Sequence, residues 1–289
     1  MMQRDGYFTE ANSADAVAAR VAATTDPRLK RVMEVLVRHL HAAVKEIEPT
    51  DAEWLRAILF LTETGHKSDD WRQEFILLSD VLGVSMLVDA INNRKPSGAS
   101  ESTVLGPFHI DGAPELPMGA NICLDAKGEP MLVVGRILDT AGQPIAGARI
   151  DVWQANDEGF YDVQQKGIQP DFNLRGVFTT GADGRYWFQG VKPKFYPIPA
   201  DGPVGGLLKA LGRHPNRPAH LHYILSAPGY QRLTTHIFDP DDPYIHSDAV
   251  FGVKASLLAR FDWQDATDPD MGVMVAHWRV AHDFVLARE

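Results

Sequence analysis

The sequence predicts a mainly β protein with an α-helical N-terminal region and an antiparallel β-sandwich domain. Apolar residues recur with helical spacing through the first hundred residues. From about residue 130 they alternate with a period of two, which is typical of half-buried strands. A run rich in Gly, Pro, Ser and Asn, residues 92–100, separates the two patterns. We therefore expect a helical region over 1–100 and a sandwich domain over 101–289.

The helical spacing predicts helices over residues 26–47, 50–65 and 68–91, the last broken near Gly83. Asp26 and Pro27 supply an N-cap and a first helical residue. Thr50 and Glu53 have the spacing of a capping box. These amphipathic helices must bury their apolar faces against the sandwich or against a second copy of the same region.

Short apolar runs separated by turn residues predict the strands of the sandwich. The candidate strands are 131–138, 148–153, 176–180, 185–188, 220–226 and 232–238. Turn signals lie at 140–144 and 181–184. The segment Gly202–Pro218, rich in Gly and Pro, is expected to form a long loop.

Composition excludes several classes of function. The 289 residues carry a formal net charge of −10, which argues against nucleic acid or an anionic membrane as the main partner. No apolar run is long enough to span a bilayer. The first ten residues lack a basic start followed by an apolar stretch, and Cys123 is the single cysteine. We therefore expect no membrane association, no disulfide and a cytoplasmic location.

Two histidines and two tyrosines carry most of the functional information. His220 and His222 lie in the apolar strand candidate, two residues apart, so their side chains point to the same face. Two imidazoles held in this way are half of a metal site. Tyr161 and Tyr196 can add two phenolate oxygens, which are hard anionic donors. Such a donor set suits a trivalent ion better than zinc or copper(I).

This constellation resembles the intradiol ring-cleaving dioxygenases, whose non-haem ferric ion is held by two tyrosines and two histidines. The resemblance covers essentially the whole chain, from the helix near Leu77 to Lys254. Four further motifs recur in the family's order: Asp151–Asn156, Gly184–Phe188, Arg217–His222 and Leu233–Thr235.

The resemblance implies a role for each residue of the site. Tyr161 and His220 would be equatorial ligands of one Fe(III) per chain, with solvent hydroxide beside them. Tyr196 and His222 would be axial, and Tyr196 would leave the ion when an aromatic diol binds. Arg217 would stabilise an anionic intermediate in the reaction with O2. The family also implies that the helical region forms a homodimer and that a phospholipid can bind there.

The resemblance also implies a substrate pocket. Leu77 and Asp80 lie three apart on one predicted helix, so a carboxylate can meet the substrate beside an apolar wall. The other positions implied are Val104, Leu105, Gly106, Pro107, Phe108, Ile198, Pro199 and Val250.

Two segments and one histidine resemble the hydroxyquinol-cleaving branch of the family. The segments are 104–109 and 247–254, and His236 stands where catechol-cleaving members usually carry Gln. Hydroxyquinol (1,2,4-trihydroxybenzene) has a third hydroxyl that Asp80 can contact, and plain catechol has none. We expect 1,2-cleavage of hydroxyquinol, with catechol or a chlorocatechol as the alternative substrate.

Two other classes of protein fit parts of the sequence. A zinc hydrolase could combine His220 and His222 with a carboxylate from Asp239, Asp241 or Asp242, although no His-Glu-x-x-His motif is present. The stretch Gly135–Ile150 also resembles non-catalytic transthyretin-like sandwich modules, which bind ligands without a metal. Metal analysis separates the three hypotheses, because they predict iron, zinc or no metal.

Overall fold

The computed structural model of the chain describes residues 7–70 and 72–289. These form two compact units that divide between Glu63 and Thr64. In the first unit, α1 (Ser13–Val21) packs against α2 (Pro27–Ile47), and α3 (Asp51–Lys67) begins. The sequence did not predict α1. The predicted boundary at residue 100, between a helical region and a sandwich domain, stays a prediction.

The helix starts in the first unit follow from their capping residues. The Asp26 carboxylate accepts the backbone N–H groups of Arg28 and Leu29 at 2.8 and 3.1 Å. Thr50 and Glu53 form the expected capping box, because each side chain accepts the other residue's backbone N–H. α3 ends at Lys67, two residues beyond the expected end.

The second unit begins with two short helices, α4 (Glu74–Val81) and α5 (Val84–Asn92). Gly83 separates them with a φ of +73°, a left-handed conformation that glycine adopts without strain, so the predicted break is confirmed. The helix expected to start at 68–71 starts at Glu74, and Trp71 lies outside the described residues.

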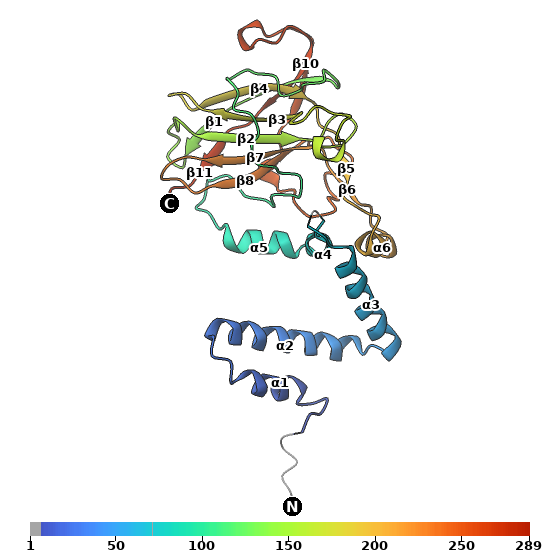
Figure 1. Ribbon diagram of the computed structural model, residues 1–289. Coiled ribbons are helices and arrows are strands. Elements are labelled where there is room, and N and C mark those ends of the chain that lie inside the picture. Colours follow the sequence, from blue (N-terminus) through green and yellow to red (C-terminus); the bar gives the residue numbers. More distant parts are fainter. Residues whose placement is uncertain (1–6, 71) are drawn as a thin grey trace, which may run out of the picture. The chain divides into compact units, whose positions relative to one another are not determined.

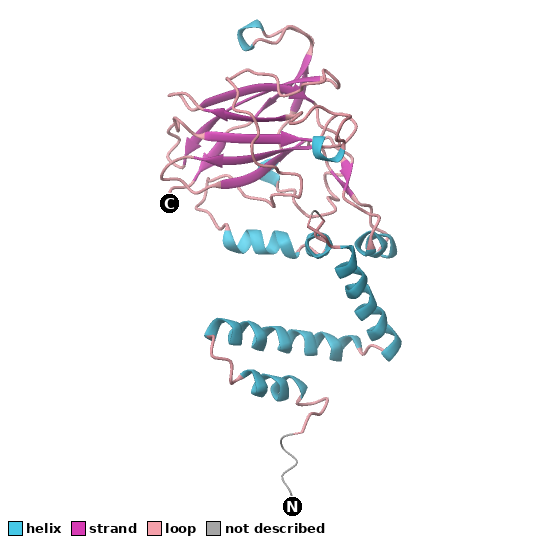
Figure 2. Ribbon diagram, viewed as in Figure 1, coloured by secondary structure: helices cyan, strands magenta, loops and turns pink. Residues whose placement is uncertain are grey.

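Two sheets form the predicted sandwich. Figure 2 shows its strands in magenta and the helices in cyan. One sheet is β3 (Arg175–Thr179), β2 (Arg149–Gln154), β7 (His220–Ser226) and β8 (Leu233–Phe238), all antiparallel (Figure 1). The other contains β1 (Pro130–Asp139), β4 (Arg185–Val191), β9 (Phe261–Gln264), β10 (His277–Ala281) and β11 (Phe284–Leu286). β1 pairs antiparallel with β4 but parallel with β10 and β11. The sequence did not predict the three C-terminal strands β9, β10 and β11.

Strand β7 is buried on both faces. Leu221, Tyr223 and Leu225 lie in the core between the two sheets, together with apolar residues of β1 and β2. The alternate residues, His220 and His222, lie on the opposite face and are equally buried. A sandwich strand normally exposes this second face to solvent. Loops therefore cover the outer face of β7, and the histidines lie beneath them.

The prediction of a long loop over Gly202–Pro218 is wrong. This segment contains α6 (Pro203–Ala210) and β6 (Asn216–Arg217), which pairs with β5 (Tyr196–Pro197). Gly205 lies inside α6, where a Cβ atom would be 2.0 Å from the Ala200 carbonyl oxygen. Close packing of backbone on backbone, and not a turn, requires this glycine.

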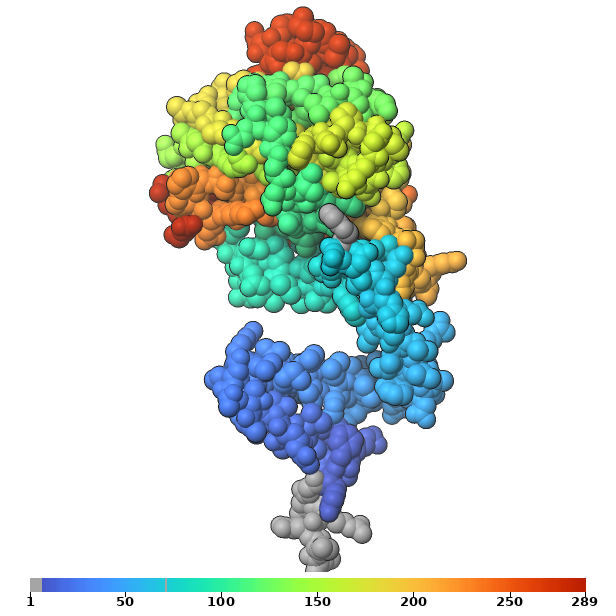
Figure 3. Space-filling view, in the orientation of Figure 1, coloured from blue at the N-terminus to red at the C-terminus, as the bar shows by residue number. Residues whose placement is uncertain are grey.

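An extended segment before β1 covers one edge of the sandwich, and its green atoms run over the surface in Figure 3. Leu116 donates its N–H to Val177 of β3, and Ile122 donates to Gln189 of β4. The segment thus pairs with β3 of one sheet and β4 of the other, and it protects these two strands at that edge. Within the described ranges, no helix has the length and apolarity needed to cross a membrane.

Candidate metal centre

The structure brings the four predicted ligands together in a buried cluster. The Tyr161 hydroxyl oxygen lies 2.8 Å from Nε2 of His222, and Nε2 of His222 lies 3.1 Å from Nε2 of His220. The Tyr196 ring is perpendicular to that of Tyr161, with ring centroids 5.4 Å apart. None of the four side chains belongs to a residue more than 2% exposed.

Three separate parts of the second unit position these side chains. The histidines come from the outer face of β7, and Tyr196 comes from β5, where it pairs with Arg217. Tyr161 immediately precedes the short helix η1 (Asp162–Gln164). The Tyr161 backbone N–H donates to the Gln164 side chain, and the Asp162 carboxylate accepts two hydrogen bonds from the buried Arg175. The loop that carries Tyr161 is thus fixed from both sides.

Both histidines are neutral, and His220 presents a lone pair. His220 donates its Nδ1–H to the Pro218 carbonyl oxygen at 2.6 Å, so its Nε2 carries a lone pair. Burial, with the nearby charge of Arg217, lowers the pKa of His220 to about 3. Burial also lowers the pKa of His222 well below its usual value. Neutral imidazoles are the form in which histidine binds a metal ion.

The chemistry of the phenols depends on a cation. Burial, with the adjacent Tyr196, raises the pKa of Tyr161 well above the ordinary value for a phenol. Without a nearby metal ion, Tyr161 therefore stays protonated at neutral pH. A trivalent ion at this position would reverse that effect and convert the phenol into an anionic ligand. Two phenolates and two neutral imidazoles fit a hard trivalent ion such as Fe(III).

Arg217 lies beside the centre and is held by a buried carboxylate. Its guanidinium donates to the Tyr196 hydroxyl oxygen at 3.5 Å and to Nε2 of His220 at 3.4 Å. On its other side, Asp248 accepts hydrogen bonds from Nε and Nη2 at 3.2 and 3.4 Å. Burial alone would lower the pKa of Arg217, but Asp248, Tyr196 and Tyr161 together outweigh it and the pKa is raised. Arg217 is therefore a permanent, oriented cation.

Aromatic contacts fix the orientation of the candidate ligands. Trp153 of β2 stacks on the His222 ring with a centroid distance of 4.6 Å and an interplanar angle of 12°. Phe108 stacks on Tyr161 at 4.5 Å. A Cβ atom at Gly106, whose φ is +77°, would lie 3.1 Å from Cε1 of His222. The predicted pocket residues Gly106 and Phe108 therefore lie at the centre.

His236 adds a third histidine. It pairs with His222 across β7 and β8, and its ring centroid lies 4.1 Å from that of His222. Nitrogen atoms of His220, His222 and His236 all lie within 4.8 Å of one another, a spacing that can hold a metal ion. The sequence predicted His236 only as a substrate contact. Its Nδ1 atom lies 3.5 Å from the Thr103 hydroxyl oxygen, and burial lowers its pKa.

The predicted substrate pocket is assembled in part. Leu77, Ile198 and Val250 pack in one apolar cluster with residues of α4 and α6. Asp80 is partly buried near the charges of Arg217 and Asp248, and burial raises its pKa although the Ser85 hydrogen bond opposes this. Leu105 and Pro107 are exposed, Val104 and Pro199 are half-buried, and the roles of these four stay predictions.

Two of the three acidic residues of the zinc-hydrolase hypothesis, Asp239 and Asp242, have other partners. Asp239 forms a salt bridge with Lys192 at 3.0 Å. Asp242 accepts the backbone N–H groups of Ala219 and Tyr244. Among the described residues, the group spaced to hold a metal ion consists of His220, His222 and His236 and includes no carboxylate. Asp239 and Asp242 are therefore not free to act as the carboxylate ligand of that alternative, and the sequence did not indicate Asp248 as the partner of Arg217.

Comparison with known proteins identifies the family. Residues 26–100 match the family model described as "Catechol dioxygenase N terminus", and residues 106–288 match the one described as "Dioxygenase". A hydroxyquinol 1,2-dioxygenase from Rhizobium sp. (strain MTP-10005) is 71% identical over 287 residues, covering 98% of this chain and 97% of the relative.

Solved structures give the same result. The hydroxyquinol 1,2-dioxygenase from Pseudomonas putida DLL-E4 superposes with a TM-score of 0.94 at 49% identity, covering 97% of this chain and 99% of that one. The catechol 1,2-dioxygenase from Acinetobacter radioresistens gives 0.82 at 29% identity, covering 98% and 94%. This chain belongs to the intradiol ring-cleavage dioxygenases, and it is an oxidoreductase of that family.

Proposed function

We propose that this protein is an Fe(III)-dependent hydroxyquinol 1,2-dioxygenase. It would use O2 to cleave the bond between the two hydroxylated ring carbons, giving 3-hydroxy-cis,cis-muconate, which tautomerises to maleylacetate. The observation that carries the proposal is the buried group of two phenols and two imidazoles beside an oriented arginine. The 71% identity to a relative with this name favours hydroxyquinol over catechol or a chlorocatechol.

In this proposal Tyr161, Tyr196, His220 and His222 hold one ferric ion. The bound ion would act as a Lewis acid toward both oxygens of the diol and would ionise the phenols. Tyr196 lies on the two-residue strand β5, between proline residues, and is the ligand we expect to leave. Its phenolate oxygen then accepts a substrate hydroxyl proton, so it acts as a general base.

Arg217 stabilises negative charge on the substrate. Its guanidinium reaches Tyr196 and His220, so a diol that displaces Tyr196 would lie within its field. The Asp248 carboxylate fixes this orientation in advance, so little reorganisation is needed when the substrate becomes charged. The site is buried, and each of these interactions is stronger there than in water.

Asp80 is the residue that we expect to recognise the third hydroxyl of hydroxyquinol. It lies three residues from Leu77 on α4, near Arg217. A carboxyl group at this position offers a hydrogen bond that only a trihydroxy ring can use. Loss of that bond leaves a buried polar group unpaired when catechol binds, which disfavours catechol.

Replacing Asp80 with alanine is expected to lower kcat/KM for hydroxyquinol by about ten- to a hundredfold while changing that for catechol little. Asp80→Asn keeps hydrogen-bonding capacity and should retain an intermediate preference for hydroxyquinol. The visible absorption of the iron site controls for an intact centre. If the ratio of the two kcat/KM values is the same in wild type and Asp80→Ala, the assigned role of Asp80 is wrong.

We also propose that the helical region forms a homodimer. An apolar stripe along α2 is exposed except at Val37, which is buried. Its exposed residues, each at least 41% exposed, are Leu29, Val32, Leu36, Leu40, Val44 and Ile47. α3 adds Trp54, Leu55, Ile58, Leu59 and Leu61. Exposed apolar faces of this extent favour association. A phospholipid, as the family implies, would bind in the same apolar region.

We also propose a cytoplasmic location, which fits the single cysteine of the chain.

Light scattering during gel filtration should give about twice the chain mass of 31.9 kDa at micromolar concentration. Leu40→Glu places a charge in the exposed stripe and should give monomers. Arg38→Glu, on the opposite side of α2, is the matched control and should remain dimeric. A wild-type monomer mass would rule the proposed dimer out.

A further inference from the structure

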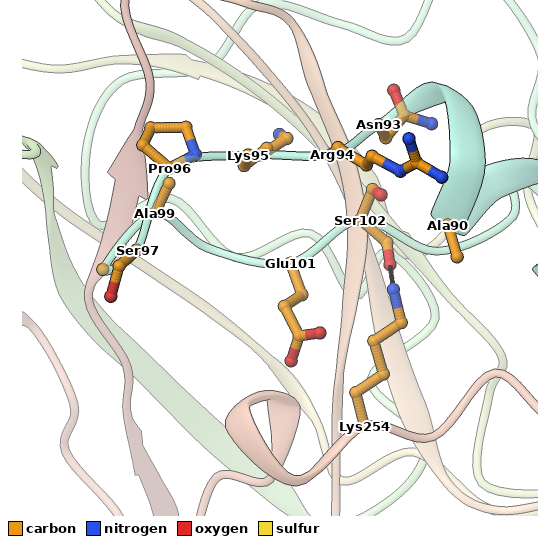
Figure 4. Close-up of a pocket in the computed structure, with 11 residues that line it drawn as sticks. Ala90, Asn93, Arg94, Lys95, Pro96, Ser97, Ala99, Glu101, Ser102 and Lys254 are labelled. Atoms are coloured by element: carbon orange, nitrogen blue, oxygen red, sulfur yellow. Dashed lines mark hydrogen bonds between the residues drawn. The ribbon is translucent and has the colours of Figure 1, made fainter.

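A polar pocket of the sandwich unit is lined by none of the candidate metal ligands. It has a volume of about 330 Å³ and is formed by the end of α5, the following segment 93–102 and Lys254 (Figure 4). Three cationic side chains line it, Arg94, Lys95 and Lys254, against one carboxylate, Glu101. This excess of positive charge stands out in a chain whose net charge is −10.

The acidic side chains nearby are already engaged. Glu101 accepts a hydrogen bond from Ser256, outside the pocket lining. Asp89, which contacts two lining residues, accepts hydrogen bonds from Ser102 at 2.9 Å and Asn93 at 2.8 Å. It also forms a salt bridge of 3.5 Å with Lys254. The single Asp89 carboxylate is therefore shared, and it cannot pair fully with both lysines.

Lys95 has no partner of its own. Its Nζ atom is buried and makes no hydrogen bond to any residue that the structure describes. Burial lowers the pKa of Lys95, and the Lys254 charge adds to this while Asp89 opposes it. Lys254, in contrast, already has an acceptor, because it donates to the Ser102 carbonyl oxygen at 2.5 Å, as the dashed line in Figure 4 shows. A buried ammonium without an acceptor is costly, so an anionic ligand would stabilise it.

We propose that this pocket binds a phosphate group, either inorganic phosphate or the headgroup of a phospholipid. A phosphate group brings about −1.5 to −2 charges at neutral pH and three acceptor oxygens. It would supply the acceptor that Lys95 lacks and would lie between the Arg94 and Lys254 charges. No residue of this pocket belongs to the group of candidate iron ligands, so the site does not depend on the proposed catalytic function.

Isothermal titration calorimetry tests the proposal. Sodium phosphate is titrated into the full-length protein in phosphate-free buffer at constant ionic strength. We expect one phosphate bound per chain, and at least a tenfold weaker Kd in Lys95→Gln. Lys209→Gln removes an exposed lysine from the last turn of α6 and is the matched control, with an unchanged Kd. Because Lys95 pairs with no described residue, Lys95→Gln should fold with an undiminished Tm in phosphate-free buffer.

Vesicles separate the two sources of the phosphate group. If vesicles of phosphatidic acid in phosphatidylcholine compete with inorganic phosphate and pure phosphatidylcholine vesicles do not, a lipid headgroup is a ligand of this pocket. If neither competes, the ligand is a soluble phosphate. The proposal is overturned if wild type binds no phosphate, or if Lys95→Gln binds it as tightly as wild type.

Discussion

Tyr161→Phe is expected to lose bound iron and visible colour together, with turnover falling below detection. Tyr161 is the candidate ligand whose oxygen lies 2.8 Å from His222, and the change removes that oxygen alone. The colour should come from charge transfer between phenolate and ferric ion, so it reports the same bond. Changes beyond a metal's first ligands already cost about 10- to 100-fold in affinity, so loss of a ligand should cost more. His220→Ala should behave in the same way.

Tyr223→Phe is the matched control. Tyr223 is also buried, and its hydroxyl has no hydrogen-bond partner among the described residues. It lies on the core face of β7, opposite His220 and His222. Elemental analysis and the visible spectrum should therefore match wild type for Tyr223→Phe. A coloured, iron-replete Tyr161→Phe protein would remove Tyr161 from the ligand set.

Arg217→Ala should keep the iron and the colour while kcat falls by about a hundred- to a thousandfold. This is the usual cost of removing one group that stabilises charge in the transition state. Arg217 donates to Tyr196 and His220 from outside the ligand group, so its loss should spare metal binding. Tyr196→Phe should differ, with part of the iron lost along with most of the turnover. Full bleaching by Arg217→Ala would contradict the assigned role.

The stability of Arg217→Ala needs its own control. The substitution leaves Asp248 buried without its cation, at a cost of about 3–5 kcal/mol. Arg217→Ala combined with Asp248→Asn removes the unpaired charge and should recover much of the lost stability. The double variant should show the same low kcat as Arg217→Ala. Recovery of kcat in the double variant would mean that the single variant failed through its fold.

The sequence predicted the architecture because periodicity depends on local residues. Strand β7 was predicted with the bounds observed, and the break at Gly83 was found from a single glycine. The parallel pairing of β1 with β10 and β11 was not predicted, because strand pairing depends on contacts distant in sequence. α6 was missed because its glycines are the usual signal of a loop.

The same limit applies to the site. His220 and His222 could be placed on one face from their spacing, and the tyrosines joined them through the family resemblance. The salt bridge of Arg217 with Asp248 links residues 31 positions apart, and no local pattern indicates it. The stacking of Trp153 on His222 follows only from the register of β2 against β7. Residues that orient the ligands thus became visible only in the fold.

The most direct test of the account is a comparison of kcat/KM for hydroxyquinol, catechol and a chlorocatechol with the purified, iron-containing protein. Oxygen consumption and loss of the diol should occur together, with one O2 used per ring cleaved. We predict that kcat/KM for hydroxyquinol exceeds that for either other diol by at least about tenfold, because Asp80 can contact a third hydroxyl. A higher kcat/KM for catechol than for hydroxyquinol would contradict the proposed substrate, and no cleavage of any diol would contradict the proposed function.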